Sequence, residues 1–80
     1  MASKSTCLLH LQPDSFAPVS RMQNLSPMMQ RRLADLGLFI GTPIALRRTA
    51  PFGGPVTIQF GSQQIGIRRS EAAQIEVLLV

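Results

Sequence analysis

The sequence predicts a mainly β fold: a small barrel of about five short strands, with one α-helix between the first and second strands and a short helical turn before the last strand. An 80-residue chain makes one domain, because it is too short for two separate cores. Its six glycines and six prolines indicate frequent chain reversals, which favour short strands over long helices. After Gly41 the apolar residues recur with the two-residue period of a strand instead of the helical period of about 3.6.

The N-terminal part of the chain predicts a tail, a turn and a first strand. Residues 1–7 are small and polar, and we expect them to be a flexible tail ahead of a single domain over residues 8–80. Pro13, Asp14 and Ser15 signal a turn, and the first strand follows at residues 16–22. Because Pro18 cannot donate a ladder hydrogen bond, this strand should lie at an edge or carry a bulge.

The helix is predicted over residues 26–37. Ser26 is a favoured N-cap, and Pro27 suits the first helical position, whose N–H has no partner in any case. One apolar stripe runs along it, formed by Leu25, Met29, Leu33 and Leu36. Gly37 stands where a left-handed residue ends a helix, which gives Leu33 and Leu38 the two positions that touch in a Schellman motif.

The second half of the chain has the alternation of half-buried strands. Strands are predicted at residues 44–49, 56–60, 65–67 and 75–80. Gly61 and Ser62 form a hairpin turn between two of them. Ser70 can cap a single helical turn over residues 71–74, with Glu71 at its positive end.

Five short strands that each bury one face are accommodated most economically by a strongly bent, SH3-like barrel with the helix over one open end. We expect Phe16, Phe39 and Phe60 to be used largely in its core. Since the chain has no Trp and no Tyr, the barrel lacks the aromatic groove with which signalling SH3 domains bind polyproline peptides.

The composition excludes several functional classes. One Cys and one His rule out a disulfide framework and a Cys/His zinc site, and four acidic residues leave little for acid–base catalysis. No nucleophile–base pair or P-loop can be assembled, so we expect no enzyme and no cofactor. The N-terminus lacks the apolar segment of a secretory signal, and the uncharged residues 49–67 are too rich in Gly, Pro and Gln to span a membrane. A cytoplasmic location is therefore expected.

Three segments resemble, in order and spacing, the ferrous iron transport protein A (FeoA) family. Residues 32–41 (RLADLGLFIG) are similar to its RRLxxLGxxxG segment, residues 48–56 (RTAPFGGPV) to its xxAPxGDP loop, and residues 67–77 (IRRSEAAQIEV) to its LRxxEAxxIxV ending. The chain departs from this pattern at Gly54, where the loop usually carries Asp, and at Asp14, where a Gly commonly precedes the first strand.

The resemblance implies a function and a partner. Family members are small cytoplasmic proteins that accompany a FeoB-type ferrous iron transporter, which has a cytoplasmic GTP-binding domain (G domain). We therefore expect a non-enzymatic accessory protein that touches this domain, is recruited by it to the inner face of the membrane, and neither inserts into the membrane nor binds nucleic acid. Self-association stays open, as does any stimulation of GTP hydrolysis.

The basic residues are candidates for contact with this partner. The chain has a net charge of +4, which suits an acidic partner surface, and its arginines include three adjacent pairs. Arg31, Arg47, Arg48 and Arg68 are the candidates, with solvated or structural roles as the alternative. Because neighbouring residues of a strand face opposite sides, we expect Arg47 and Arg48 to lie on different surfaces.

The loop at residues 50–55 is the strongest interface candidate, through Pro51, Phe52 and Gly53. It places an aromatic side chain between turn residues, where the strand pattern does not bury it. The alternative is that Phe52 folds back over the barrel.

The sequence gives only weak evidence of a metal site. Cys7 and His10 are three residues apart and Asp14 follows, but the cluster begins in the predicted tail and has no second His. We expect no metal, with Cys7 and His10 as the residues to test.

Two other functional classes fit the same fold. One is a regulatory module like the SH3 domain of metal-dependent repressors. The other is a basic nucleic-acid-binding barrel, which is disfavoured because stacking aromatics are missing and the positive charge does not form a run.

Overall fold

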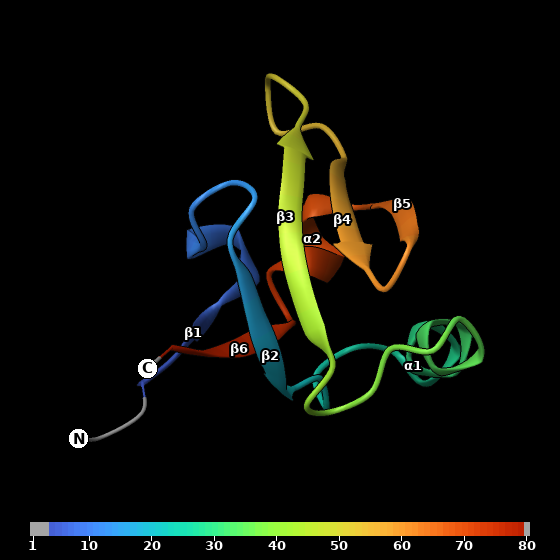
Figure 1. The fold of residues 1–80 in the computed structure, drawn as a ribbon. Helices are drawn as coiled ribbons and strands as arrows, with labels where there is room; N and C mark the ends of the chain where they lie inside the picture. The colour runs from blue at the N-terminus through green and yellow to red at the C-terminus, as the bar shows by residue number, and fades with distance from the viewer. Residues whose placement is uncertain (1–3, 80) are drawn as a thin grey trace.

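The structure, a computed structural model, describes residues 4–79. Its elements are β1 (Lys4–Cys7), the 3₁₀ helix η1 (Leu8–His10), β2 (Phe16–Arg21), α1 (Pro27–Asp35), β3 (Pro43–Thr49), β4 (Val56–Phe60), β5 (Gln63–Ile67), α2 (Arg69–Ala72) and β6 (Glu76–Leu79). The strands form one antiparallel sheet in the order β1-β6-β2-β3-β4-β5, which Figure 1 shows strongly bent. The mainly β class predicted from the sequence is confirmed.

The sheet bends at β2, because this strand changes partners along its length. Its first half, to Pro18, pairs with β3, and its second half, from Val19, pairs with β6. A bulge between Val19 and Arg21 follows directly. Pro18 has no N–H to donate and lies where the partner changes, so the bulge predicted from this proline is present although β2 is an inner strand.

Residues 4–7 differ from the predicted tail. They form β1, which pairs with β6 in the register Lys4↔Leu79 to Cys7↔Glu76. The strand lies at an edge of the sheet and is held mainly by backbone pairing, so its side chains stay exposed or half-buried. Without an apolar alternation there was no strand signal to detect. Residues 1–3 of the predicted tail, and residue 80, lie outside the described residues.

Both ends of α1 are formed as the sequence predicts. The Ser26 hydroxyl accepts a hydrogen bond from the Met29 N–H at 3.2 Å. At the other end Gly37 has a φ of +100°, and the Leu38 N–H donates to the Leu33 carbonyl at 2.9 Å. Together with the bond from the Gly37 N–H to the Ala34 carbonyl at 3.0 Å, this is a Schellman motif.

α2 begins earlier than predicted. It spans Arg69–Ala72, and the residue before it is Arg68, whose backbone N–H donates to Glu71 Oε1 at 2.8 Å. The predicted cap, Ser70, lies inside the helix. Glu71 stabilises the start through its side chain, because the third helical position can reach back to the residue that precedes the helix.

The core is aliphatic, with a single phenylalanine. Its largest fully buried side chains are Phe60, Leu8, Leu33, Leu38, Ile44, Ile58, Ile75, Val19, Val56 and Val77. The expectation that Phe16 and Phe39 also serve the core is wrong, since they are 51% and 56% exposed. Ala17 takes the inward position of β2 beside Phe16, and Leu38 takes the buried position beside Phe39.

α1 packs at the end of the barrel where the β4–β5 hairpin turns. The Gln63 side chain at the start of β5 donates through Nε2 to the Leu36 carbonyl at 2.6 Å. The loop at residues 50–55 extends from the opposite end of β3, as Figure 1 shows. None of the helices described between residues 4 and 79 has the length and apolar character to cross a membrane.

Candidate functional site

The loop at residues 50–55, between β3 and β4, holds its aromatic side chain in solvent. The Ala50 N–H donates to the Pro55 carbonyl at 3.0 Å, and the Gly54 N–H donates to the Pro51 carbonyl at 3.2 Å. These bonds close the loop on itself. Phe52, at its tip, is 104% exposed, so the alternative in which it folds back over the barrel is wrong.

The backbone at the tip is strained. Phe52 has a φ of +59° and Gly53 a φ of +73°, both in the left-handed region. Glycine adopts this region freely, but it costs an L-residue with a bulky side chain on the order of 1–2 kcal/mol. No burial of the ring offsets this cost. A strained and fully exposed aromatic is a position at which a functional role is sought.

The base of the loop is supported from α2. Arg69 Nη2 donates to the Ala50 carbonyl in a long contact of 3.5 Å, and its Nε is buried without a hydrogen-bond partner among the described residues. A Cβ at Gly54 would lie 2.9 Å from Ala50 Cβ, so the loop closes more tightly there than a side chain allows. No local pattern in the sequence predicts the Arg69 contact, because it joins segments 19 residues apart.

Arg47 and Arg48 lie on one surface, contrary to the expectation from strand alternation. Leu46 pairs with Ile58 and Arg48 pairs with Thr57, so Arg47 is an extra residue in β3. Such a bulge sets two residues opposite one and breaks the regular alternation of side chains. Both arginines therefore line a single hollow of about 220 Å³, together with Thr57 and Gln64.

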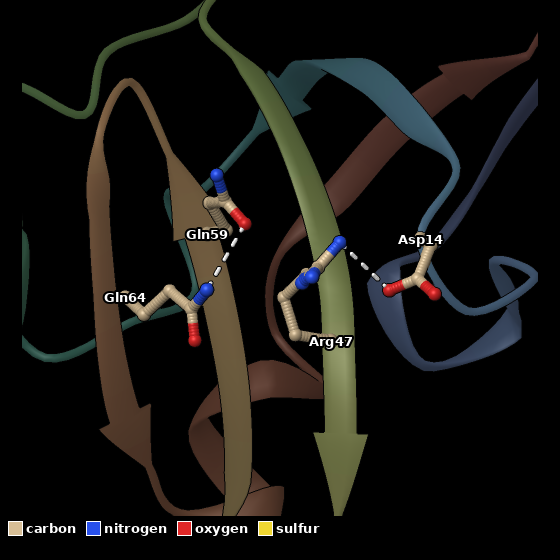
Figure 2. Close-up of polar contacts among 4 residues, drawn as sticks. All are labelled: Asp14, Arg47, Gln59 and Gln64. Carbon is tan, nitrogen blue, oxygen red and sulfur yellow. Dashed lines mark hydrogen bonds and ion pairs between the residues drawn. The ribbon is translucent and has the colours of Figure 1, made fainter.

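Asp14 holds the bulge in two ways. Its backbone N–H donates to the Leu46 carbonyl at 2.9 Å, and its Oδ1 accepts from Arg47 Nη1 at 2.9 Å, the contact drawn in Figure 2. The two side chains are 37% and 62% exposed for Arg47 and Asp14 respectively, so the ion pair contributes at most about 1 kcal/mol to stability. Its main effect is to fix the direction of the Arg47 guanidinium.

The side of the hollow on β4 and β5 is uncharged. Gln64 Nε2 donates to Gln59 Oε1 at 3.3 Å across the two strands, as Figure 2 shows. Thr57 adds a half-buried hydroxyl. Thr57 and Gln64 did not stand out in the sequence, because outward-facing polar residues of a strand carry no functional signal of their own.

The other predicted contact residues lie elsewhere. Arg31 is on the exposed side of α1 and lines a hollow of about 480 Å³ with Met28, Leu36 and Ile65, among others. Arg68 borders a second hollow of about 530 Å³, which Met28 and Arg32 of α1 also line and which touches Pro55. The seven predicted residues therefore do not form one patch: Arg47, Arg48 and the loop are joined by β3, and Arg31 lies on the helix at the far end of the barrel.

Cys7 and His10 do not converge with Asp14. The Cys7 thiol accepts from the Leu9 N–H at 3.4 Å and points to the Ala73 carbonyl at 3.6 Å, which places it as the cap of η1. His10 Nδ1 lies 3.4 Å from the Thr6 hydroxyl. Between residues 4 and 79 no three His, Cys, Asp or Glu side chains are grouped as metal ligands. The Asp14 carboxylate is bound to Arg47 instead.

Comparison with known proteins gives a family match over nearly the whole chain. The model of the FeoA domain matches residues 6–79. The FeoA protein from Chlorobium tepidum has 32% sequence identity and a TM-score of 0.82, with 94% of this chain and 71% of that chain covered. FeoA from Stenotrophomonas maltophilia, solved in complex with zinc, has 29% identity and a TM-score of 0.72, with 91% and 88% covered.

The same architecture occurs in a larger regulator. A manganese-dependent transcriptional repressor has a TM-score of 0.82 at 18% identity, and this identity shows the fold alone. The chain is covered completely but spans only 44% of the repressor. The S. maltophilia protein is described as a prokaryotic SH3 domain protein, which confirms the predicted SH3-like class. No curated protein sequence matches the chain.

Proposed function

The chain belongs to the FeoA domain family, and we propose that it is a non-enzymatic cytoplasmic accessory protein of ferrous iron uptake that binds the cytoplasmic G domain of a FeoB-type transporter. The family match covers residues 6–79 and supports a role in ferrous iron transport. The S. maltophilia relative has itself been proposed as an activating factor of ferrous iron transport.

The observation that carries the proposed contact is Phe52. It is 104% exposed, at a φ of +59°, on a loop closed by its own backbone hydrogen bonds. A large aromatic ring that is already held away from the protein can be buried by a partner at a small further cost in conformational entropy. Aromatic anchors of this kind contribute much of the binding energy of many interfaces. We therefore assign Phe52, with Pro51 and Gly53, to the contact.

Electrostatics supports a partner of opposite charge. The net charge is +4, and Arg47 and Arg48 lie in β3, directly before the loop. A basic surface next to an aromatic anchor favours an acidic surface on the transporter domain, and the attraction speeds encounter at low salt. Recruitment to the inner face of the membrane then follows from the transporter and needs no lipid contact of this chain.

The binding experiment compares two exposed apolar side chains. Isothermal titration of the transporter's G domain is carried out with the wild type, Phe52→Ala and Met28→Ala. Met28 is 82% exposed on α1, so the control removes a similar amount of exposed apolar side chain from a different element, outside the loop.

We expect Phe52→Ala to weaken binding about tenfold or more, with its melting temperature preserved, and Met28→Ala to bind like the wild type. Unchanged binding of Phe52→Ala would remove the loop from the contact. Absence of binding by the wild type in all nucleotide states of the domain would remove the proposed function.

A further inference from the structure

The hollow beside the β3 bulge has an unequal charge pattern. Arg47 and Arg48 both line it, and Asp14 pairs with Arg47 only. The structure gives Arg48 no ion pair with any described acid. The local sum of these three charges is therefore +1, with the excess positive charge at Arg48.

We propose that this hollow receives one carboxylate, from an Asp or Glu side chain of the protein partner, and that Asp14 is a competing internal carboxylate that holds Arg47. The proposal deepens the proposed function, on which the identity of the partner rests. It names the chemistry of the contact: Arg48 binds the incoming carboxylate, and the Thr57 hydroxyl and Arg47 supply further donors.

The donors in the hollow match this ligand. A guanidinium presents a planar fork that fits the two oxygens of a carboxylate, and the resulting hydrogen bonds are charge-assisted. One carboxylate neutralises the local +1, whereas a phosphate dianion would leave the site with a negative charge beside Asp14. The contact that Arg47 already makes, 2.9 Å to Asp14 Oδ1, is an example of the same pairing within the chain.

The position of the hollow supports a protein as the source. The 220 Å³ space lies on the outer face of β3, β4 and β5, and Arg48 is two residues from the start of the loop that carries Phe52. A partner that covers Phe52 can therefore reach Arg48 from the same side of the chain. An acidic side chain next to an apolar contact gives such a surface both affinity and orientation.

The test uses two ligands and a matched set of variants. The first ligand is a tetraglutamate peptide with blocked ends, with tetraglutamine and inorganic phosphate as comparisons, followed through the arginine Nε–H signals in NMR. The second is the transporter's G domain, followed by titration. The variants are Arg48→Gln, Asp14→Asn and, as a control with the same charge change as Arg48→Gln, Arg21→Gln.

For both ligands we expect Arg48→Gln to raise the dissociation constant roughly threefold to tenfold. Arg21→Gln should change the logarithm of the dissociation constant by less than about half as much. Asp14→Asn should strengthen binding about twofold to fivefold, because it frees Arg47. Asn tolerates the left-handed backbone at this position, where φ is +68°, so the gain is measured in a folded protein. A gain of affinity cannot come from unfolding.

Three results would overturn the proposal. Equal losses of affinity in Arg48→Gln and Arg21→Gln would show that net charge alone matters. Saturable binding of phosphate without binding of tetraglutamate, or weaker binding by Asp14→Asn, would also contradict it. Tetraglutamate binding at Arg48 without any binding of the transporter domain would retain the carboxylate site and remove the proposed function. Binding of the transporter domain that depends on Phe52 but not on Arg48 would retain the proposed function and remove the carboxylate site.

Discussion

Asp14 and Arg47 form an ion pair of 2.9 Å at a β-bulge, and the backbone N–H of the same aspartate donates to the Leu46 carbonyl one residue earlier. The aspartate reaches both groups from a left-handed backbone, with a φ of +68°. Glycine adopts this φ without strain, and aspartate tolerates it better than most other residues. In this chain the aspartate supplies a carboxylate that orients an arginine.

The two roles of Asp14 can be separated by substitution. Asp14→Ala loses the ion pair, and alanine lacks the short polar side chain with which aspartate tolerates the left-handed region, so we expect a loss of about 1–2 kcal/mol in the free energy of unfolding. Asp14→Gly loses the ion pair but has no strain, and it should be more stable than Asp14→Ala by about 1 kcal/mol. Urea denaturation of both variants measures the difference. Equal stabilities would show that the backbone conformation of Asp14 carries no cost.

Phe52 should show a conflict between stability and binding. Phe52→Gly fits the φ of +59° without strain, whereas Phe52→Ala does not, so we expect the glycine variant to be more stable than the alanine variant by about 1 kcal/mol. Both variants lose the aromatic ring and should bind the transporter domain equally weakly. Thermal unfolding and titration measure the two effects. A glycine variant that unfolds more easily than the alanine variant would contradict the strain at the loop tip.

The phenylalanines test the composition of the core. Phe60 is 1% exposed and Phe16 is 51% exposed. We expect Phe60→Leu to lower the free energy of unfolding by about 1–2 kcal/mol, because it leaves a gap in a close-packed interior. Phe16→Leu should change it by less than about 0.5 kcal/mol. Similar losses of unfolding free energy in the two variants, measured by denaturant unfolding, would show that Phe16 also contributes to the core.

The helix end at Gly37 tests the Schellman motif. A Cβ at Gly37 would meet nothing within 4 Å, so any loss in Gly37→Ala comes from the φ of +100°. We expect Gly37→Ala to lower the free energy of unfolding by about 1–2 kcal/mol. Gly66→Ala is the control, since its Cβ would have only one neighbour, the Val56 carbonyl at 4.0 Å, and its φ is not left-handed. Hydrogen exchange in α1 should rise in Gly37→Ala alone.

The sequence predicts the local structure well where the signal is local. The cap at Ser26 and the helix end at Gly37 depend on neighbouring residues and are present as expected. β1 was missed, because an edge strand with polar side chains has no apolar alternation. The expectation that Phe16 and Phe39 lie in the core was wrong because hydrophobicity alone does not say which of two adjacent residues faces inward.

The candidate site was predicted in part. The sequence identified the loop as an interface candidate but left open whether Phe52 is exposed or folds back over the barrel, and the structure shows that it is exposed. The common surface of Arg47 and Arg48 could not be predicted, because the bulge depends on the register between β3 and β4 and on the contact of Asp14 with Leu46. Arg69 was missed since its contact with Ala50 joins distant segments. The sequence does not predict these features because they depend on contacts between residues that are far apart in the chain.

We propose that the loop at residues 50–55 contacts the transporter, and site-specific photo-cross-linking tests this contact most directly. Position 52 is replaced by p-benzoylphenylalanine, and position 28, which is also exposed to solvent on α1, serves as the control. Each protein is irradiated with the G domain of the transporter. We predict a cross-linked product at position 52, reduced at high salt, and none at position 28. A product at position 28 alone, or none at either position, would contradict the claim.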